Sequence, residues 1–103
     1  LAKILKGERT IRFSFIYGSY ATGADKTGSD IDLFIIGKAS GMDPVAEKIS
    51  DLEKKISREI NYRFFSEADF KKALKGKNSF IINIIKNKKV FLIGDEKDFR
   101  KFN

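Results

Sequence analysis

Two aspartates separated by one residue, Asp30 and Asp32, lie at the start of an apolar stretch that predicts a β-strand. Side chains alternate along a strand, so both carboxylates should point to one face, while Ile31 and Leu33 point into the core. Adjacent carboxylates repel each other unless a cation neutralises them. Mg²⁺ is the natural cation, because it prefers oxygen ligands and takes the remaining ones from water and phosphate. The pair therefore predicts a site for a metal–phosphate complex.

A Gly-Ser step, Gly18-Ser19, ends the preceding predicted strand and indicates a phosphate-binding turn. Glycine lets a phosphate approach the backbone, and free amides together with the Ser19 hydroxyl can donate to an anion. An isolated Asp-x-Asp pair or Gly-Ser step is common in surface turns, but here both stand at the ends of consecutive predicted strands. If the two strands are neighbours, a metal–triphosphate complex fits between them, as in-line phosphoryl or nucleotidyl transfer requires.

The elements that must position these residues predict an α/β (α+β) fold, a small mixed β-sheet with helices packed against it. Alternating β-branched and aromatic residues predict strands at 11–17, 31–36, 59–65 and 90–93. Apolar residues at helical spacing predict helices at 44–56, 67–75 and 79–87, the last of them in the chain, and a single helical turn is expected at 20–24. We expect N-caps at Asp43, at Ser66 and at Asn78 or Ser79. Two core faces are expected on the helices: Val45, Ile49, Leu52 and Ile56, and Phe80, Ile81, Ile84 and Ile85.

Length and composition limit the possible classes of protein. With 103 residues, 42% of them hydrophobic and ten of them Phe, the sequence predicts one globular domain over 1–103. Residues 1–7 are expected to be the end of a helix whose earlier part lies outside the sequence. The chain has neither Cys nor His, so a bound metal must be a hard ion held by oxygen. No apolar run approaches the roughly 18–20 residues of a membrane span, and we expect a cytoplasmic location.

The formal charge of +7 is unevenly distributed. The last third of the chain is strongly basic, and only Asp95, Glu96 and Asp98 oppose its cations. Such a region could meet a nucleic acid or a triphosphate, or it could be a solvated lysine surface, which we favour. Its basic residues are Lys71, Lys72, Lys75, Lys77, Lys86, Lys88, Lys89, Lys97, Arg100 and Lys101.

The two motifs together, G-S-x-A-x-G followed by S-D-I-D-L, resemble the signature of the minimal nucleotidyltransferases of the DNA polymerase β-like superfamily. This chain has Thr22 where that family usually has Arg. The resemblance implies transfer of a nucleoside monophosphate from an NTP, most naturally ATP, to an acceptor, with Mg²⁺ or Mn²⁺ as cofactor. It further implies metal binding and catalysis by Asp30 and Asp32. The implied nucleotide-binding residues are Gly18, Ser19, Gly23 and Ser29.

The family normally carries a third carboxylate on the third strand, near the acceptor hydroxyl, and here that position is Asn61. Asn61 can coordinate through its carbonyl but cannot take a proton. Glu59 shares the face of Asn61 by alternation and is our candidate third carboxylate, although it stands about 6–7 Å away along the strand. Glu59 could equally be a solvated residue before the strand. Arg63, on the same face, either is simply exposed, which we favour, or reaches a phosphate.

Three functions are open on this sequence. The first is an active nucleotidyltransferase, which in such families often pairs with a small helical HEPN protein in a toxin–antitoxin system. The second is a nucleotide-binding regulatory module without catalysis, linked to a DNA-binding domain, and Asn61 favours it. The third is a basic nucleic-acid-binding module, which would bind with a steep salt dependence.

Overall fold

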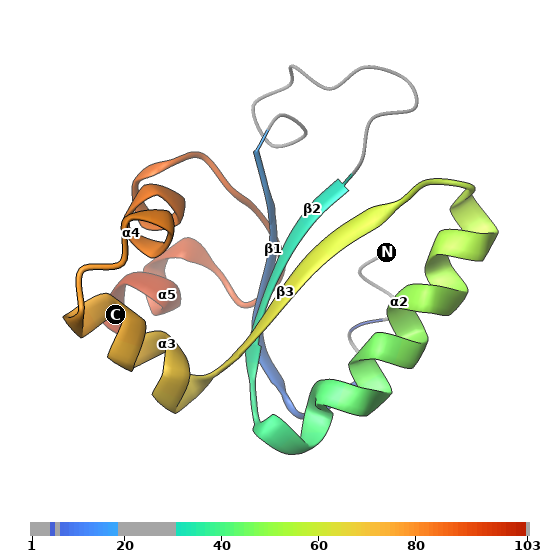
Figure 1. The fold of residues 1–103 in the computed structure, drawn as a ribbon, viewed down its shortest axis with the longest axis horizontal. Helices are drawn as coiled ribbons and strands as arrows, with labels where there is room; N and C mark the ends of the chain where they lie inside the picture. Colours follow the sequence, from blue (N-terminus) through green and yellow to red (C-terminus); the bar gives the residue numbers. More distant parts are fainter. Residues whose placement is uncertain (1–4, 6, 19–30, 103) are drawn as a thin grey trace.

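Four strands, β1 (Ile11–Tyr17), β2 (Ile31–Gly37), β3 (Ile60–Ser66) and β4 (Val90–Ile93), form one sheet in the order β3–β2–β1–β4 (Figure 1). The computed structural model describes residues 5, 7–18 and 31–102. Strand β1 runs antiparallel to both β2 and β4, while β2 and β3 are parallel. The expected mixed sheet is therefore confirmed. Three strands begin at the predicted residue, and β3 begins one residue later than predicted, at Ile60, so that Glu59 lies just before it.

The first long helix, α2 (Met42–Ile56), follows a short 3₁₀ turn, η1 (Ala39–Gly41). The prediction that Asp43 caps this helix is wrong, because the cap is Gly41 and no side chain closes it. Asp43 lies instead in the first turn, where its negative charge favours the positive end of the helix. Ile56 was expected in the core, but it is the last residue of the helix and is 38% exposed, whereas Val45, Ile49 and Leu52 are buried as expected.

Two of the expected helix caps are confirmed. Helix α3 (Glu67–Lys75) begins where the Asp69 amide donates to Ser66 Oγ at 3.1 Å. Helix α4 (Ser79–Lys86) begins where the Ile81 amide donates to Asn78 Oδ1 at 3.2 Å. These hydrogen bonds satisfy amides that have no partner within the helix. The sequence pattern thus located both helix starts correctly.

A further helix, α5 (Glu96–Phe102), ends the fold, and the sequence reading missed it. We had expected the helix over 79–87 to be the last. The amide of Asp98 donates to Asp95 Oδ1 at 2.8 Å, which makes Asp95 an N-cap three residues upstream. Phe99 is fully buried, and together with the partly buried Phe102 it packs the short helix against the aromatic core.

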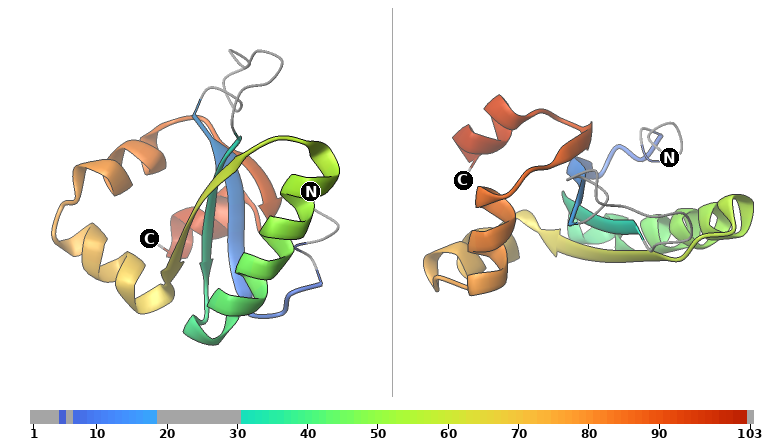
Figure 2. Two further views of the ribbon diagram at one scale, coloured as in Figure 1. Left: turned by 45° about the vertical axis from the view of Figure 1, so that its right-hand side comes forward. Right: turned by 90° about the horizontal axis from the view of Figure 1, so that it is seen from above.

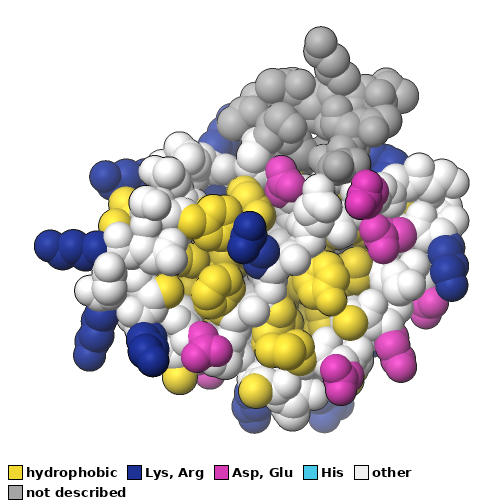
Figure 3. Space-filling model, viewed as in Figure 1, with side chains coloured by type: hydrophobic (Ala, Val, Ile, Leu, Met, Phe, Trp, Pro, Cys, Tyr) yellow, Lys and Arg dark blue, Asp and Glu magenta, His cyan; other side chains and the backbone are white. Residues whose placement is uncertain are grey.

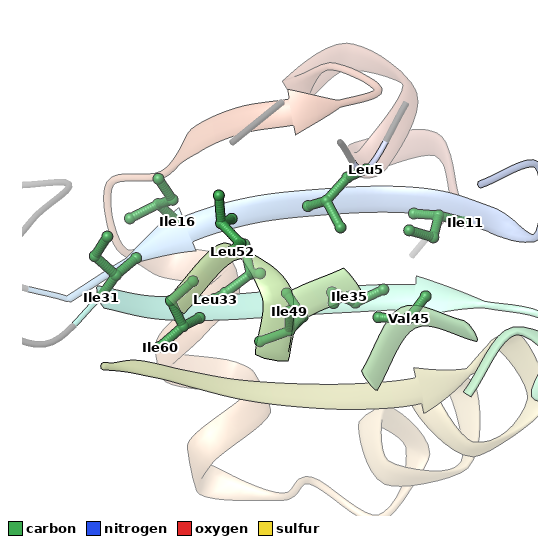
Figure 4. Close-up of a cluster of buried hydrophobic side chains, with 10 residues drawn as sticks. All are labelled: Leu5, Ile11, Ile16, Ile31, Leu33, Ile35, Val45, Ile49, Leu52 and Ile60. Atoms are coloured by element: carbon green, nitrogen blue, oxygen red, sulfur yellow. The ribbon is translucent and has the colours of Figure 1, made fainter. Parts of the chain in front are cut away.

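The helices cover both faces of the sheet, with α2 on one face and α3, α4 and α5 on the other (Figure 2). Beneath α2 the core is aliphatic, and its side chains from the helix point toward the strands (Figure 4). The opposite core is aromatic: Phe13, Phe15, Phe34 and Phe70 are buried there. Phe65 and Phe91 pack against this cluster, and Phe64 packs against the aliphatic one, so these phenylalanines are packing residues as expected.

The strand directions bring the two sequence motifs together. Because β1 and β2 are antiparallel neighbours, the end of β1 at Tyr17 lies beside the start of β2 at Asp32. The upper end of the sheet, where β1 ends and β2 begins, is therefore where the candidate site must be sought.

Within the described ranges, no helix has the length and apolar character needed to cross a membrane.

Candidate functional site

A row of three residues crosses the sheet at this end. Tyr17 is the ladder partner of Asp32 on one side, and Asn61 is its partner on the other. Neighbouring strands lie roughly 5 Å apart, so these side chains share one face at close range. Asp32 is half-buried, whereas Asn61 is exposed. Asn61 therefore occupies the place beside Asp32 where the sequence analysis had located the family's third carboxylate.

Gly18 follows β1 directly and has a left-handed backbone, with φ of +75°. A Cβ at this position would stand 2.8 Å from Asp32 Oδ2. Both the backbone conformation and the contact require glycine. The turn that was expected to bind phosphate therefore begins against the carboxylate that was expected to bind metal.

An open cavity of about 720 Å³ lies in front of this row. Arg63 is exposed, as favoured, yet its guanidinium also forms part of the cavity wall, 4.4 Å from the centre of the Phe80 ring. Arg63 also donates a hydrogen bond to the Tyr17 hydroxyl. The cation–π contact and the hydrogen bond together hold the guanidinium against the Phe80 ring and the Tyr17 hydroxyl. The described residues that line the cavity are Tyr17, Asp32, Ile60, Asn61, Tyr62, Arg63 and Phe80.

Tyr17 reports the electrostatics of this cavity. Burial raises the pKa of the Tyr17 hydroxyl, and the neighbouring Asp32 carboxylate raises it further. Arg63 opposes both, through its charge and its hydrogen bond. Asp32 and Arg63 thus act with opposite sign on one hydroxyl, which places one negative and one positive charge within reach of the same cavity.

Several predicted site residues, Ser19, Gly23, Ser29 and Asp30, lie outside the described residues. Glu59 is exposed just before β3, and its backbone carbonyl accepts the Ile31 amide at 3.0 Å. Its side chain is not among the described groups that line the cavity. The structure thus places both Gly18 and Asn61 beside Asp32.

The donor chemistry at Asp32 suits a hard divalent cation. The Asp32 carboxylate and the Asn61 amide both offer oxygen atoms, and they are ladder partners at the mouth of an open cavity. Among residues 5, 7–18 and 31–102, no three acidic side chains gather into a metal-binding cluster. On the described part of the chain, Mg²⁺ would therefore meet one carboxylate and one neutral amide.

A second cavity, of about 370 Å³, adjoins the first and shares Tyr17 and Phe80 with it. The sequence analysis had assigned Phe80 to the core alone, although it is half-buried and lines both cavities. The available signal in the sequence was Asn83, an amide that interrupts an otherwise apolar helix, together with Asn87 at the end of that helix. The second cavity is lined by Tyr17, Gly18, Phe80, Asn83, Ile84, Asn87 and Lys88.

The basic end of the chain is mostly a solvated surface. Every basic residue named there is exposed except Lys89, whose side chain is only 2% exposed. On the face seen in Figure 3, hydrophobic side chains reach the surface between α4 and the sheet and again over β3, with a basic side chain between them. The expected surface role is wrong for Lys89, because its ammonium group caps carbonyls at the end of α4.

Comparison with known families and structures identifies the family of this chain and structures with a similar fold. The family model described as Polymerase beta, Nucleotidyltransferase matches residues 1–97, and the chain belongs to this family. The crystal structure of a toxin–antitoxin with AMP-PNP is similar in fold, with a TM-score of 0.66 and 19% identity, over 97% of this chain and 75% of that one. Comparison with curated proteins gives no match.

Two crystal structures of mutants of the toxin–antitoxin MntA-HpeT are also similar in fold. One has a TM-score of 0.65 and 17% identity, over 97% of this chain and 75% of that one. The other has a TM-score of 0.63 and 19% identity, over 97% of this chain and 74% of that one. The fold expected from the sequence is thus that of nucleotidyltransferases, and in this chain Asp32 lies next to the neutral Asn61 in the cavity wall.

Proposed function

We propose that this chain transfers a nucleoside monophosphate from an NTP, ATP first, to a hydroxyl of a partner protein, with Mg²⁺ or Mn²⁺ as cofactor. The observation that carries the proposal is the contact of the Gly18 turn with Asp32 at the mouth of an open cavity. Family membership and a similar structure with AMP-PNP support the nucleotide. Similar toxin–antitoxin structures support a protein partner, for which a HEPN-type protein is our candidate.

In this proposal Gly18 and Ser19 hold the terminal phosphates, Gly23 and Ser29 support them, and Asp30 and Asp32 hold the metal. When bound by these aspartates, a divalent cation would neutralise the triphosphate charge and polarise the reacting phosphoryl group. The cavity mouth beside Asp32 is where the acceptor oxygen approaches, since the open space lies there.

The transfer itself exchanges one bond for another at the α-phosphorus. A bond forms from the acceptor oxygen to the α-phosphorus, and the bond from the α-phosphorus to the bridging oxygen breaks. Pyrophosphate leaves with the electron pair of the broken bond. The acceptor hydroxyl must also lose its proton. Asn61 has no basic group, so in our proposal Glu59 takes this proton.

A second candidate function, nucleotide binding without transfer, is favoured by one observation. The ladder neighbour of Asp32 on β3 is the neutral Asn61, where an active site would use a carboxylate. Such a module would bind Mg²⁺–ATP and pass the signal to a linked domain, of which a DNA-binding domain is our candidate.

One assay separates these functions. The protein is incubated with α-labelled ATP, Mg²⁺ and a co-expressed partner, and transfer is compared for wild type, Asp30→Ala with Asp32→Ala, and Glu59→Gln. Asp51→Asn, an exposed carboxylate on α2, serves as the control. Transfer that depends on both aspartates and on Glu59 supports the first function. Calorimetric binding of Mg²⁺–ATP without transfer supports the second, and absence of both at millimolar ATP rejects both.

A further inference from the structure

The second cavity differs in character from the first, and its walls come mainly from one face of α4. Asn83 and Ile84 lie three and four residues after Phe80, so these three side chains share one face of α4, and Asn87 is the C-cap residue just after the helix. Ile84 is buried and Phe80 half-buried, while both asparagines are exposed. The cavity therefore has an apolar floor and two amides at its rim.

The same cavity touches the proposed phosphate turn. Gly18 is one of its lining residues, and the ring of Tyr17 stands next to that of Phe80, with centroids 6.1 Å apart and planes at 78°. Gly18 in turn contacts Asp32 in the first cavity. A ligand whose phosphates lie at Gly18 and Asp32 could therefore extend its other end over α4.

The chemistry of this space matches a nucleobase. Aromatic rings stack on bases, which contributes about 1–3 kcal/mol per base. An asparagine amide offers one donor and one acceptor in the pattern that reads the N6 and N7 edge of adenine. A mostly apolar cavity with amides at the rim is thus suited to a flat ring system with polar edges, and its volume of about 370 Å³ accommodates a purine.

We infer that this cavity is the base-recognition subsite of the NTP, with adenine held by Asn83 and Asn87 beside Phe80. The inference rests on the proposed function, since it presumes that an NTP binds at Gly18 and Asp32. It adds the residues that choose the base. It also divides the site, with the base over α4 and the polar cavity in front of Arg63 left for the acceptor.

The test measures binding, not transfer. Calorimetry compares Mg²⁺ complexes of a non-hydrolysable ATP analogue, the matching CTP analogue and inorganic tripolyphosphate. The variants are Asn83→Ala with Asn87→Ala, and Phe80→Leu as a second variant that keeps an apolar side chain. Lys86→Ala, exposed on the same helix and outside the cavity, is the matched control. Circular dichroism confirms that each variant is folded.

We expect the double variant to bind the ATP analogue about 10-fold more weakly, as loss of one good base contact implies, and to bind tripolyphosphate as wild type does. Phe80→Leu should weaken both base-containing ligands. Unchanged ATP affinity in the double variant, or an equal loss for tripolyphosphate, would overturn the base assignment while leaving the proposed function intact. Failure of wild type to bind any of the three ligands would overturn both.

Discussion

Gly18 and Asp32 lie so close together that a Cβ on Gly18 would stand 2.8 Å from Asp32 Oδ2. The two residues are far apart in sequence, and the antiparallel pairing of β1 with β2 brings them into contact. This contact couples the backbone of the proposed phosphate turn to the position of the proposed metal ligand. Any side chain at position 18 must therefore displace the carboxylate or move the turn.

Replacing Gly18 with Ala should reduce both stability and nucleotide binding. The left-handed backbone costs a residue with a Cβ about 1–2 kcal/mol, and the new methyl group pushes Asp32 out of place. Urea unfolding measures the first effect and calorimetry with Mg²⁺–ATP the second. Gly76→Ala is the matched control, because its Cβ would meet nothing closer than 3.5 Å and its φ is −75°. If Gly18→Ala matches Gly76→Ala in both measurements, the contact has no functional importance.

Replacing Asn61 with Asp should strengthen metal binding at the cost of stability in the absence of metal. A second carboxylate beside Asp32 adds like-charge repulsion, which a divalent cation relieves. Titration with Mn²⁺ followed by electron paramagnetic resonance should show tighter binding. Thermal melts without metal should show a lower Tm, and transfer should rise if the missing acid limits it. Asn78→Asp, which adds the same charge at a helix cap that Asp also serves, should change none of these.

Much of the fold could be predicted from sequence because its determinants are local. Ser66 and Asn78 cap their helices with side chains that reach amides three residues on, so the helix starts are visible in a short window. Gly41 caps α2 with backbone alone, and no local side chain marks that start. Helix α5 is only seven residues long, with one buried residue, Phe99, so its apolar periodicity was too short to detect.

The candidate site was predictable only in its first part. Alternation along β2 was enough to separate Asp32 from the core residues Ile31 and Leu33. The cavity wall formed by Tyr17, Arg63 and Phe80 could not be predicted, because its residues come from two strands and a helix that are distant in sequence. Which strand lies beside which is a tertiary property, and it alone determines that Asn61 is the partner of Asp32.

The titration of Tyr17 should reveal the charges that surround it. Its pKa is raised by burial and then by Asp32, and Arg63 opposes this, so Asp32→Asn should lower the pKa and Arg63→Met should raise it. Ultraviolet difference spectra over pH 8–12 measure the ionisation, and Tyr17→Phe identifies its contribution among the three tyrosines.

This pKa shift also affects stability in alkaline solution. The unfolded chain releases the Tyr17 proton near its ordinary pKa of about 10, while the folded chain still holds it. The free energy of unfolding should therefore fall as the pH rises from about 10 through the raised pKa of the folded state. In Tyr17→Phe this part of the decline should be absent. A pKa that is the same in wild type, Asp32→Asn and Arg63→Met would contradict the arrangement of charges described here.

Lys89 should be one of the most important cations for stability, although it resembles a surface lysine in the sequence. Its Nζ donates to the carbonyl oxygens of Ile84, Ile85 and Asn87 at 3.2, 2.9 and 2.9 Å, and so completes the end of α4. It also lies 3.7 Å from Glu96 Oε1 and 5.7 Å from the centre of the Phe99 ring, which connects α4 to α5.

Lys89→Met keeps the length of the side chain but leaves those carbonyls without their charged donor. Loss of a hydrogen bond to a charged group costs about 1.5–3 kcal/mol, so we expect a decrease of that size in the free energy of unfolding, measured in urea. Lys86→Met, an exposed lysine on the same helix, should change stability by less than about 0.5 kcal/mol. Because Asn83 lies on α4 and Asn87 is its C-cap, binding of the ATP analogue should weaken in Lys89→Met as well. Equal stability of the two variants would mean that the end of α4 is held by packing alone.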